Sequence, residues 1–253
     1  MEERPQGAVK VLCNHCSEDR LDFEFTMAFQ PIVNSSTRQI FGYEALVRGL
    51  NNESAYSIIS QVNDENRYLF DQKCRIKAIE LAAKLGVDSM LSINFLPNAV
   101  YKPERCIRTT LEAAKLYGFP LDRILFEFTE VEKMEDTSHV KRIVEYYKSF
   151  GFMTALDDFG SGYSGLCLLA DFQTNIVKID MSLIRNIHLD KVRQSIVGNT
   201  ISIFHDLNIT ALAEGIETYE EFVWLQEAGI ELMQGYYFAK PGFEALPEVY
   251  FPN

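Results

Sequence analysis

The sequence predicts an α/β fold, a modified (β/α)8 barrel of the TIM type whose first strand runs antiparallel to its neighbour. Three observations predict it. The chain has 253 residues, a length at which single α/β barrels are common. Eight short apolar or β-branched runs follow one another along the chain, and segments with helical periodicity separate most of them, as in a closed parallel barrel. The gap after the first run is too short for a helix.

The expected strands are runs that are too short for helices and that end at turn or helix-start residues. In chain order they are residues 26–33, 39–47, 90–95, 123–129, 153–157, 175–180, 209–213 and 232–238. The expected helices combine good helix formers with apolar residues three or four positions apart. They are Lys73 to Lys84, Arg105 to Tyr117, Thr137 to Phe150, Asp190 to Leu207 and Thr218 to Ala228. Thr137 and Thr218 lie in typical helix starts, and Gly151 and Gly229 are typical helix ends.

The connection between the first two runs sets the direction of the first strand. Only residues 34–38 separate them, which is the length of a hairpin and not of a helical crossover. We therefore expect these two strands to be antiparallel.

Composition indicates one globular domain and excludes some partners. Hydrophobic residues make up 47% of the chain, and the formal net charge is −12, so a cationic face for DNA or RNA polymers is not expected. No segment has the apolar length of a membrane span, and residues 1–7 lack a signal-peptide pattern. We expect a cytoplasmic protein with an N-terminal arm or linker at residues 1–24 and one domain at residues 25–253.

The five cysteines predict reduced thiols, because an odd number in a large chain does not suggest a disulfide framework. Cys13, His15 and Cys16 form the one cluster. They could bind a metal, but no second Cys/His pair lies nearby in the sequence, and a structural zinc needs four ligands. An unliganded arm is the favoured alternative.

Polar residues stand where the predicted strands end, at the rim where barrels of this type carry their sites. Asp157 and Asp158 are adjacent and precede a glycine-rich turn. In strand order from the second run, the rim residues are Glu44, Asn94, Glu127, Asp157 with Asp158, Lys178, Glu214 and Gln234. A single one would be an ordinary satisfied polar group, but so many carboxylates together need compensating cations.

Apart from Lys178, the residues at this rim all offer oxygen atoms as ligands, and no histidine or cysteine joins them. Oxygen ligands suit hard cations, so we expect two Mg²⁺ or Mn²⁺ ions, with Asp157 able to bridge them. Two such ions a few ångströms apart are a recurrent arrangement for in-line attack of water at phosphorus. A neighbouring lysine can stabilise the charge that develops, and an outer carboxylate can accept the proton.

The sequence resembles the EAL-domain family, bacterial phosphodiesterases that linearise cyclic di-GMP, over about residues 26–242. The tripeptide Glu44-Ala45-Leu46 alone would carry no weight, but the ordered set is specific. The matching strings also include Phe29-Gln30-Pro31-Ile32-Val33, Phe126-Glu127-Phe128-Thr129-Glu130, Asp157-Asp158-Phe159-Gly160, Lys178-Ile179-Asp180, Ala213-Glu214-Gly215-Ile216-Glu217 and Gln234-Gly235-Tyr236.

This resemblance implies a role for each matching residue. The implied metal ligands are Glu44, Asn94, Glu127, Asp157, Asp158 and Glu214, where Glu214 is a second-metal ligand or the general base. The implied catalytic residues are Lys178, Glu214 and Glu217, the last steadying the loop after the fifth strand. The implied substrate contacts are Gln30, Leu46, Arg48, Asp180 and Gln234. The implied reaction is hydrolysis of one 3′,5′-phosphodiester of cyclic di-GMP to give linear pGpG.

Two other functions remain open at this point: a catalytically inactive receptor for the dinucleotide, and a protein-interaction module such as an antirepressor. The resemblance also implies a homodimer formed near residues 159–172. The alternative is that Leu166, Leu168 and Leu169 fill the outer layer of the barrel.

Overall fold

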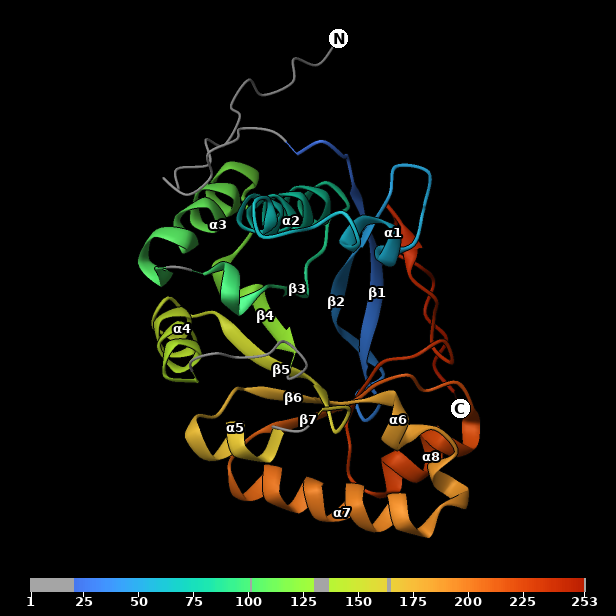
Figure 1. Cartoon of the computed structure of the whole chain (residues 1–253). Helices are drawn as coiled ribbons and strands as arrows, with labels where there is room; N and C mark the ends of the chain where they lie inside the picture. The colour runs from blue at the N-terminus through green and yellow to red at the C-terminus, as the bar shows by residue number, and fades with distance from the viewer. Residues whose placement is uncertain (1–20, 101, 130–136, 163–164, 253) are drawn as a thin grey trace.

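The computed structural model shows a barrel of strands with helices outside it (Figure 1). It describes residues 21–100, 102–129, 137–162 and 165–252. Residues 1–20 of the predicted arm therefore lie outside the described residues, and so does the whole cluster of Cys13, His15 and Cys16. Within them, no helix is long and apolar enough to cross a membrane.

The barrel wall is closed, which confirms the predicted modified (β/α)8 fold. Neighbouring strands follow the order β2-β3-β4-β5-β6-β7-β8-β1, and β1 also pairs with β2. The strands are β1 (Thr26–Asn34), β2 (Gln39–Arg48), β3 (Met90–Asn94), β4 (Ile124–Thr129), β5 (Met153–Phe159), β6 (Ile176–Ile179), β7 (Thr210–Ala213) and β8 (Leu232–Met233). Strands β2 to β8 pair in parallel.

Strand β1 is antiparallel to β2, as the short connection predicted. The turn is built around Asn34, whose side-chain oxygen accepts hydrogen bonds from the backbone N–H groups of Ser36 and Thr37 at 3.0 and 2.8 Å. Such an Asx turn needs no helix and reverses the chain directly.

The eighth run is shorter as a strand than the sequence predicted. Only Leu232 and Met233 pair, and they pair with Val33 and Asn34 of β1. The other half of that edge of β1 pairs with a short strand that was not predicted, β9 (Gly242–Phe243), through Ala28 and Phe29. The C-terminal segment, red in Figure 1, thus runs beside β1 and covers backbone groups that would otherwise form an open edge.

The outer layer contains the predicted helices and several short ones. The helices are α1 (Ala55–Ile59), α2 (Arg67–Lys84), α3 (Pro103–Tyr117), α4 (Thr137–Ser149), α5 (Gly165–Asp171), α6 (Met181–Ile184), α7 (Lys191–Asp206) and α8 (Tyr219–Glu227). Helix α2 begins six residues before the predicted start at Lys73. Helix α8 begins with a capping box, in which Thr218 and Glu221 each accept from the other's backbone N–H.

Candidate metal centre

The inside of the barrel has an apolar floor with a polar ring above it. Alternate residues of a strand share a face, so an interior apolar residue is followed two positions later by an interior polar one. The floor is a buried cluster of Ile32, Leu125, Ala155, Ile176, Leu212 and Leu232. Two positions from them, in the same order, stand Gln30, Glu127, Asp157, Lys178, Glu214 and Gln234. Strand periodicity therefore brings these six predicted residues together.

Lys178 lies at the centre of the ring and is 1% exposed. Its Nζ atom lies 2.8 Å from Glu214 Oε1, 2.9 Å from Glu127 Oε2, 3.1 Å from Asp157 Oδ1 and 3.5 Å from Glu44 Oε2. Within the described part of the chain, it is the one cation that pairs with these acids. One ammonium group thus faces four carboxylates.

Glu44 is held by two amide groups as well. Asn94 Nδ2 donates to Glu44 Oε1 at 2.9 Å, and Gln234 Nε2 donates to Glu44 Oε2 at 3.0 Å. These bonds fix the Glu44 carboxylate in the ring. Because the Asn94 amide nitrogen donates to Glu44, its side-chain oxygen is the atom that can bind a cation.

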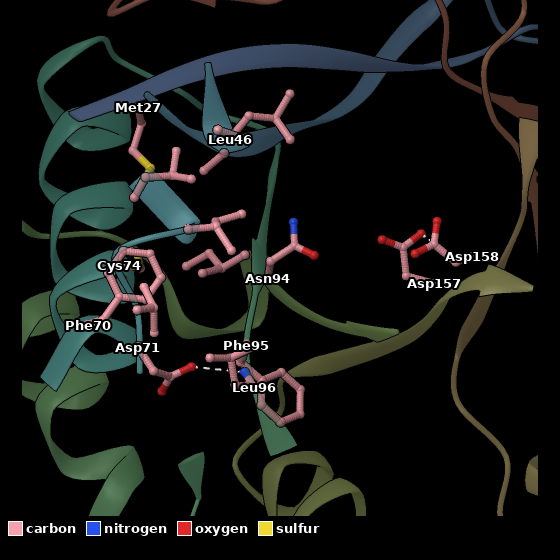
Figure 2. A pocket seen from close by; sticks show the side chains of 16 residues that line it. Met27, Leu46, Phe70, Asp71, Cys74, Asn94, Phe95, Leu96, Asp157 and Asp158 are labelled. Atoms are coloured by element: carbon pink, nitrogen blue, oxygen red, sulfur yellow. Dashed lines mark hydrogen bonds between the residues drawn. The ribbon is translucent and has the colours of Figure 1, made fainter. Parts of the chain in front are cut away.

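A bulge in β5 brings Asp157 and Asp158 to the same site. Leu156 pairs with Val177 and Phe159 with Ile179, so both aspartates stand opposite Lys178 alone. Asp158 has φ 57°, a left-handed conformation that is uncommon for a residue with a side chain. Its backbone N–H donates to Asp157 Oδ1 at 2.9 Å, and Figure 2 shows the two carboxylates side by side.

The crowding of acids changes their proton affinities. Burial, with the charges of Glu44 and Asp157, raises the pKa of Glu127 to about 8 although Lys178 opposes the shift. Burial and Asp157 raise the pKa of Asp158 to about 6 and that of Glu214 well above its usual range. Burial disfavours the Lys178 ammonium, but the surrounding carboxylates outweigh it and hold the pKa of Lys178 well above the ordinary value.

Two groups of three acids are spaced for cation binding, and they share Asp157. One is Glu44, Glu127 and Asp157, and the other is Asp157, Asp158 and Glu214; in each, ligand oxygens lie within 4.8 Å of one another. Once all five carboxylates are ionised, they and the one ammonium leave four negative charges, which two divalent cations would neutralise. Glu127 Oε1 is buried and makes no hydrogen bond within the described residues. These residues fit two hard cations.

A polar cleft of about 280 Å³ opens on one side of this ring. Gln30, Asp180, Glu217 and Gln234 line it together with Glu44, Asp158 and Glu214. Asp180 caps α6 by accepting from Ser182 N at 2.9 Å. Glu217 is exposed, and its carboxylate accepts from Arg185 Nη2 at 2.7 Å. Its predicted contact with the loop after β5 stays a prediction.

A second cleft, of about 360 Å³ and mainly apolar, opens on the other side. Leu46 lines it with Ala55 and Ile59 of α1, and it reaches Asn94 and Asp157. Arg48 is at the end of β2, half-buried, with its guanidinium donating to Val47 O at 2.7 Å. It does not contact the acidic ring among the described interactions.

Sequence analysis did not identify two residues of the site, Gly215 and Asp71. Gly215, next to Glu214, has φ 66°, and a Cβ atom there would lie 2.3 Å from Met181 Cβ; its place after a strand-end acid was the available signal. Asp71 lines the apolar cleft and is 2% exposed. Its spacing of four from Arg75 is the usual signal of a surface pair, so burial was not foreseen.

Residues 159–172 bear on the predicted dimer. Leu168 and Leu169 are buried in the outer layer, whereas Leu166 is 60% exposed. Leu168 and Leu169 therefore fill the outer layer of the barrel, which was the alternative to a dimer contact, and Leu166 is available to a partner.

The fold and the site together define the class of protein. It is a closed (β/α)8 barrel with an antiparallel first strand, and the acidic ring at the carboxyl ends of its strands is a candidate centre for two cations. The chain belongs to the EAL domain family, whose model matches residues 16–241.

Known structures and relatives support this membership. A standalone versatile EAL protein from Vibrio cholerae O395, solved with c-di-GMP bound, is 75% identical to this chain with a TM-score of 0.89. The match covers 91% of this chain and 98% of the Vibrio chain. Klebsiella pneumoniae BlrP1, in a manganese/cyclic-diGMP complex, is 33% identical with a TM-score of 0.85, covering 92% of this chain and 59% of its own.

Two curated relatives differ in what their names say. The blue light- and temperature-regulated antirepressor BluF of Escherichia coli is 34% identical over 89% of this chain and 56% of its own length. The cyclic di-GMP phosphodiesterase PA2567 of Pseudomonas aeruginosa is 29% identical over 98% of this chain and 43% of its own. The chain thus spans about half the length of these relatives.

Proposed function

We propose that this chain is a cyclic-di-GMP-specific phosphodiesterase that hydrolyses one phosphodiester bond to give linear pGpG. The observation that carries the proposal is the pair of acidic groups that share Asp157 around Lys178. Family membership and the relatives named as cyclic di-GMP phosphodiesterases support the substrate. The manganese and cyclic-diGMP complex of BlrP1 supports a divalent metal, which we propose to be Mg²⁺ or Mn²⁺.

The residues have distinct proposed roles. Glu44, Asn94, Glu127 and Asp157 would hold one ion, and Asp157, Asp158 and Glu214 the other. When bound, two such ions activate water and neutralise charge that develops on the phosphate oxygens. Lys178 pairs its ammonium with the carboxylates and would contact the attacking water while keeping its proton. Glu214 would be either a ligand of the second ion or, in its ionised form, the base that accepts a proton from water, and Glu217 would steady the neighbouring loop.

The substrate would lie across the ring, because clefts open on both sides of it. Gln30, Asp180 and Gln234 line the polar cleft and would bind the substrate there, and Leu46 lines the apolar one. Arg48 stands at the end of β2 and would turn its guanidinium to a phosphate oxygen.

The rival functions make different predictions. BluF, an antirepressor by name, keeps open an interaction module or an inactive receptor. A non-catalytic member would tolerate the loss of a ligand, and every predicted ligand is present in this chain. The complete set therefore favours an enzyme.

Incubation of the purified protein with cyclic di-GMP and Mg²⁺ or Mn²⁺, followed by chromatography, tests the proposal. We expect pGpG to accumulate, and chelation by EDTA to stop it. Binding without turnover would indicate a receptor, and neither binding nor turnover would indicate an interaction module.

We also propose a homodimer in the cytoplasm. Leu166 on α5 is exposed. Leu189, just before α7, is 75% exposed, and Val192 and Ile196 in the first turns of α7 are 68% and 47% exposed. Such an apolar stripe is typical of a helix that packs on a partner. Sedimentation of the wild type beside Val192→Glu tests it: we expect a dimer that becomes a monomer, and a monomeric wild type would contradict it.

A further inference from the structure

A buried charged network lies outside the barrel wall, directly behind two of the predicted metal ligands. Asp71 and Arg75 of α2 form an ion pair of 2.7 Å between Oδ2 and Nη2, and Arg75 Nη1 donates to the Tyr147 hydroxyl of α4 at 2.9 Å. Asp71 is 2% exposed, and Arg75 and Tyr147 are 0% exposed. An ion pair this deep is costly to desolvate and is weak evidence of stabilisation by itself.

The network contacts the chain where the ligands are attached. Asp71 Oδ1 accepts the backbone N–H of Leu96 at 3.0 Å, a bond drawn as a dashed line in Figure 2. Leu96 is two residues beyond Asn94, immediately after β3 ends. Because the strand ladder stops at Asn94, this carboxylate takes over the anchoring of the backbone.

The anchor extends to the neighbouring strand. The backbone N–H of Phe95 donates to the carbonyl of Glu127 at 2.9 Å. The Arg75 guanidinium lies over the rings of Phe95 and Phe126, at 5.4 and 5.1 Å from their centroids. Phe95 follows Asn94 and Phe126 precedes Glu127 in the sequence. The network therefore contacts both ligand-bearing strands on the outer side of the barrel wall.

We propose that Asp71 is a positioning residue for the cation ligands Asn94 and Glu127, and that Arg75 and Tyr147 hold its carboxylate in place. The inference rests on the proposed function, since it concerns the same cation site. Partners that orient metal ligands commonly affect metal affinity about 10- to 100-fold. A merely structural network would affect the stability of the fold and leave affinity unchanged.

Two double variants separate these roles. Asp71→Asn/Arg75→Met and Asp71→Leu/Arg75→Met both remove the buried charges. The difference that matters for the test is that asparagine keeps an oxygen that can accept the Leu96 N–H, whereas leucine, which is apolar and larger, does not. Val197→Ala, a cavity variant on α7 far from the network in the sequence, serves as the control for lost stability.

Mn²⁺ binding to metal-free protein, followed by the loss of the free-ion EPR signal, is the readout, with melting temperature measured alongside. We expect Asp71→Leu/Arg75→Met to bind Mn²⁺ about tenfold more weakly than wild type. Asp71→Asn/Arg75→Met should stay within about threefold of wild type, and Val197→Ala should melt earlier with unchanged affinity.

Equal affinities in the leucine variant and the wild type would overturn this inference alone. Equal losses in all three variants would do the same, because they would trace affinity to stability. If neither double variant folds, Tyr147→Phe replaces them: binding weaker by more than about threefold supports the role, and an affinity within that range of wild type overturns it. A wild-type protein that binds no Mn²⁺ would overturn the proposed function and this inference together.

Discussion

Lys178 Nζ and Glu127 Oε2 lie 2.9 Å apart inside the barrel, with side chains only 1% and 0% exposed. The pair is not self-sufficient, because three more carboxylates, those of Glu44, Asp157 and Glu214, lie within 3.5 Å of the same ammonium. The excess negative charge is the physical basis for two divalent cations in this account, and each prediction below follows from it.

Asp157→Asn should abolish turnover while the fold survives. Asp157 is shared by both acidic groups, so its loss weakens both proposed cation positions. The variant loses an attraction to Lys178 but also repulsions with Glu127 and Glu214, so we expect the metal-free melting temperature to stay within about 3 °C of wild type. Turnover should fall at least about 100-fold. Asp206→Asn, at an aspartate whose side chain is 84% exposed, is the matched control; normal turnover in Asp157→Asn would exclude the shared role.

Lys178→Met should lower turnover more than substrate affinity. The ammonium acts on developing charge, so we expect kcat to fall about 100-fold and KM to change less than about threefold. The metal-free variant should also melt earlier above neutral pH, because its acids lose their compensating charge, and Mg²⁺ should restore much of the loss. Lys77→Met removes a half-buried lysine that pairs with Glu80, away from the acidic ring, and should change neither kcat nor the metal-free melting temperature. Equal effects on kcat and KM at Lys178 would make it a substrate anchor only.

Cation binding should release protons and strengthen as pH rises. Glu127, with a pKa of about 8, holds a proton at neutral pH that a cation must displace. The pKa of Glu214 is raised in the same direction by burial and by Asp157. We expect Mn²⁺ affinity to rise about tenfold per pH unit from pH 6 and to level off above about pH 8. Calorimetry in two buffers of different ionisation enthalpy counts the protons; binding without proton release would contradict the raised pKa values.

The same acids should make the metal-free fold less stable as pH rises. Their folded pKa values lie above the unfolded ones, so between about pH 4.5 and pH 8 the folded state binds more protons than the unfolded state. Stability then falls through that window and levels off above it. Thermal melts of the metal-free protein from about pH 5 to pH 8 test this. A melting temperature that rises over this range would contradict the prediction.

Gly215→Ala should displace Glu214. The backbone there has φ 66°, and the added Cβ would lie 2.3 Å from Met181 Cβ, so the loop must shift. We expect loss of stability of about 1 to 3 kcal/mol and a larger loss of turnover. Gly198→Ala on α7, where an added Cβ has open space, should gain up to about 1 kcal/mol with unchanged turnover. Thermal melts and turnover of the two variants decide this; wild-type turnover in Gly215→Ala would show that the loop adapts.

The ring was predictable because strand periodicity determines it. Glu127, Asp157, Lys178 and Glu214 each follow a short apolar run, and alternation along a strand is enough to bring them to one interior layer. The bulge at Asp158 was not predictable in the same way, since its φ of 57° depends on how β5 meets β6. Two adjacent aspartates on a regular strand would point to opposite faces.

The outer layer and the C-terminal edge were less predictable, because tertiary contacts decide them. Strand β9 has two residues and no periodicity of its own; it forms because β8 leaves part of β1 unpaired. Asp71 and Arg75 have the spacing of a surface ion pair. Only the packing of α2 against α3 and β3, with Tyr147 of α4 against Arg75, buries them. Arg48 remains outside the ring among the described interactions, so its substrate contact stays a prediction.

Anomalous diffraction from crystals of the wild type soaked in Mn²⁺ tests the central claim most directly. We expect two peaks at the barrel mouth, both within about 2.2 Å of an Asp157 carboxylate oxygen, with Glu44 and Glu127 around one and Asp158 and Glu214 around the other. A mouth without peaks, or a single peak that does not touch Asp157, would contradict it.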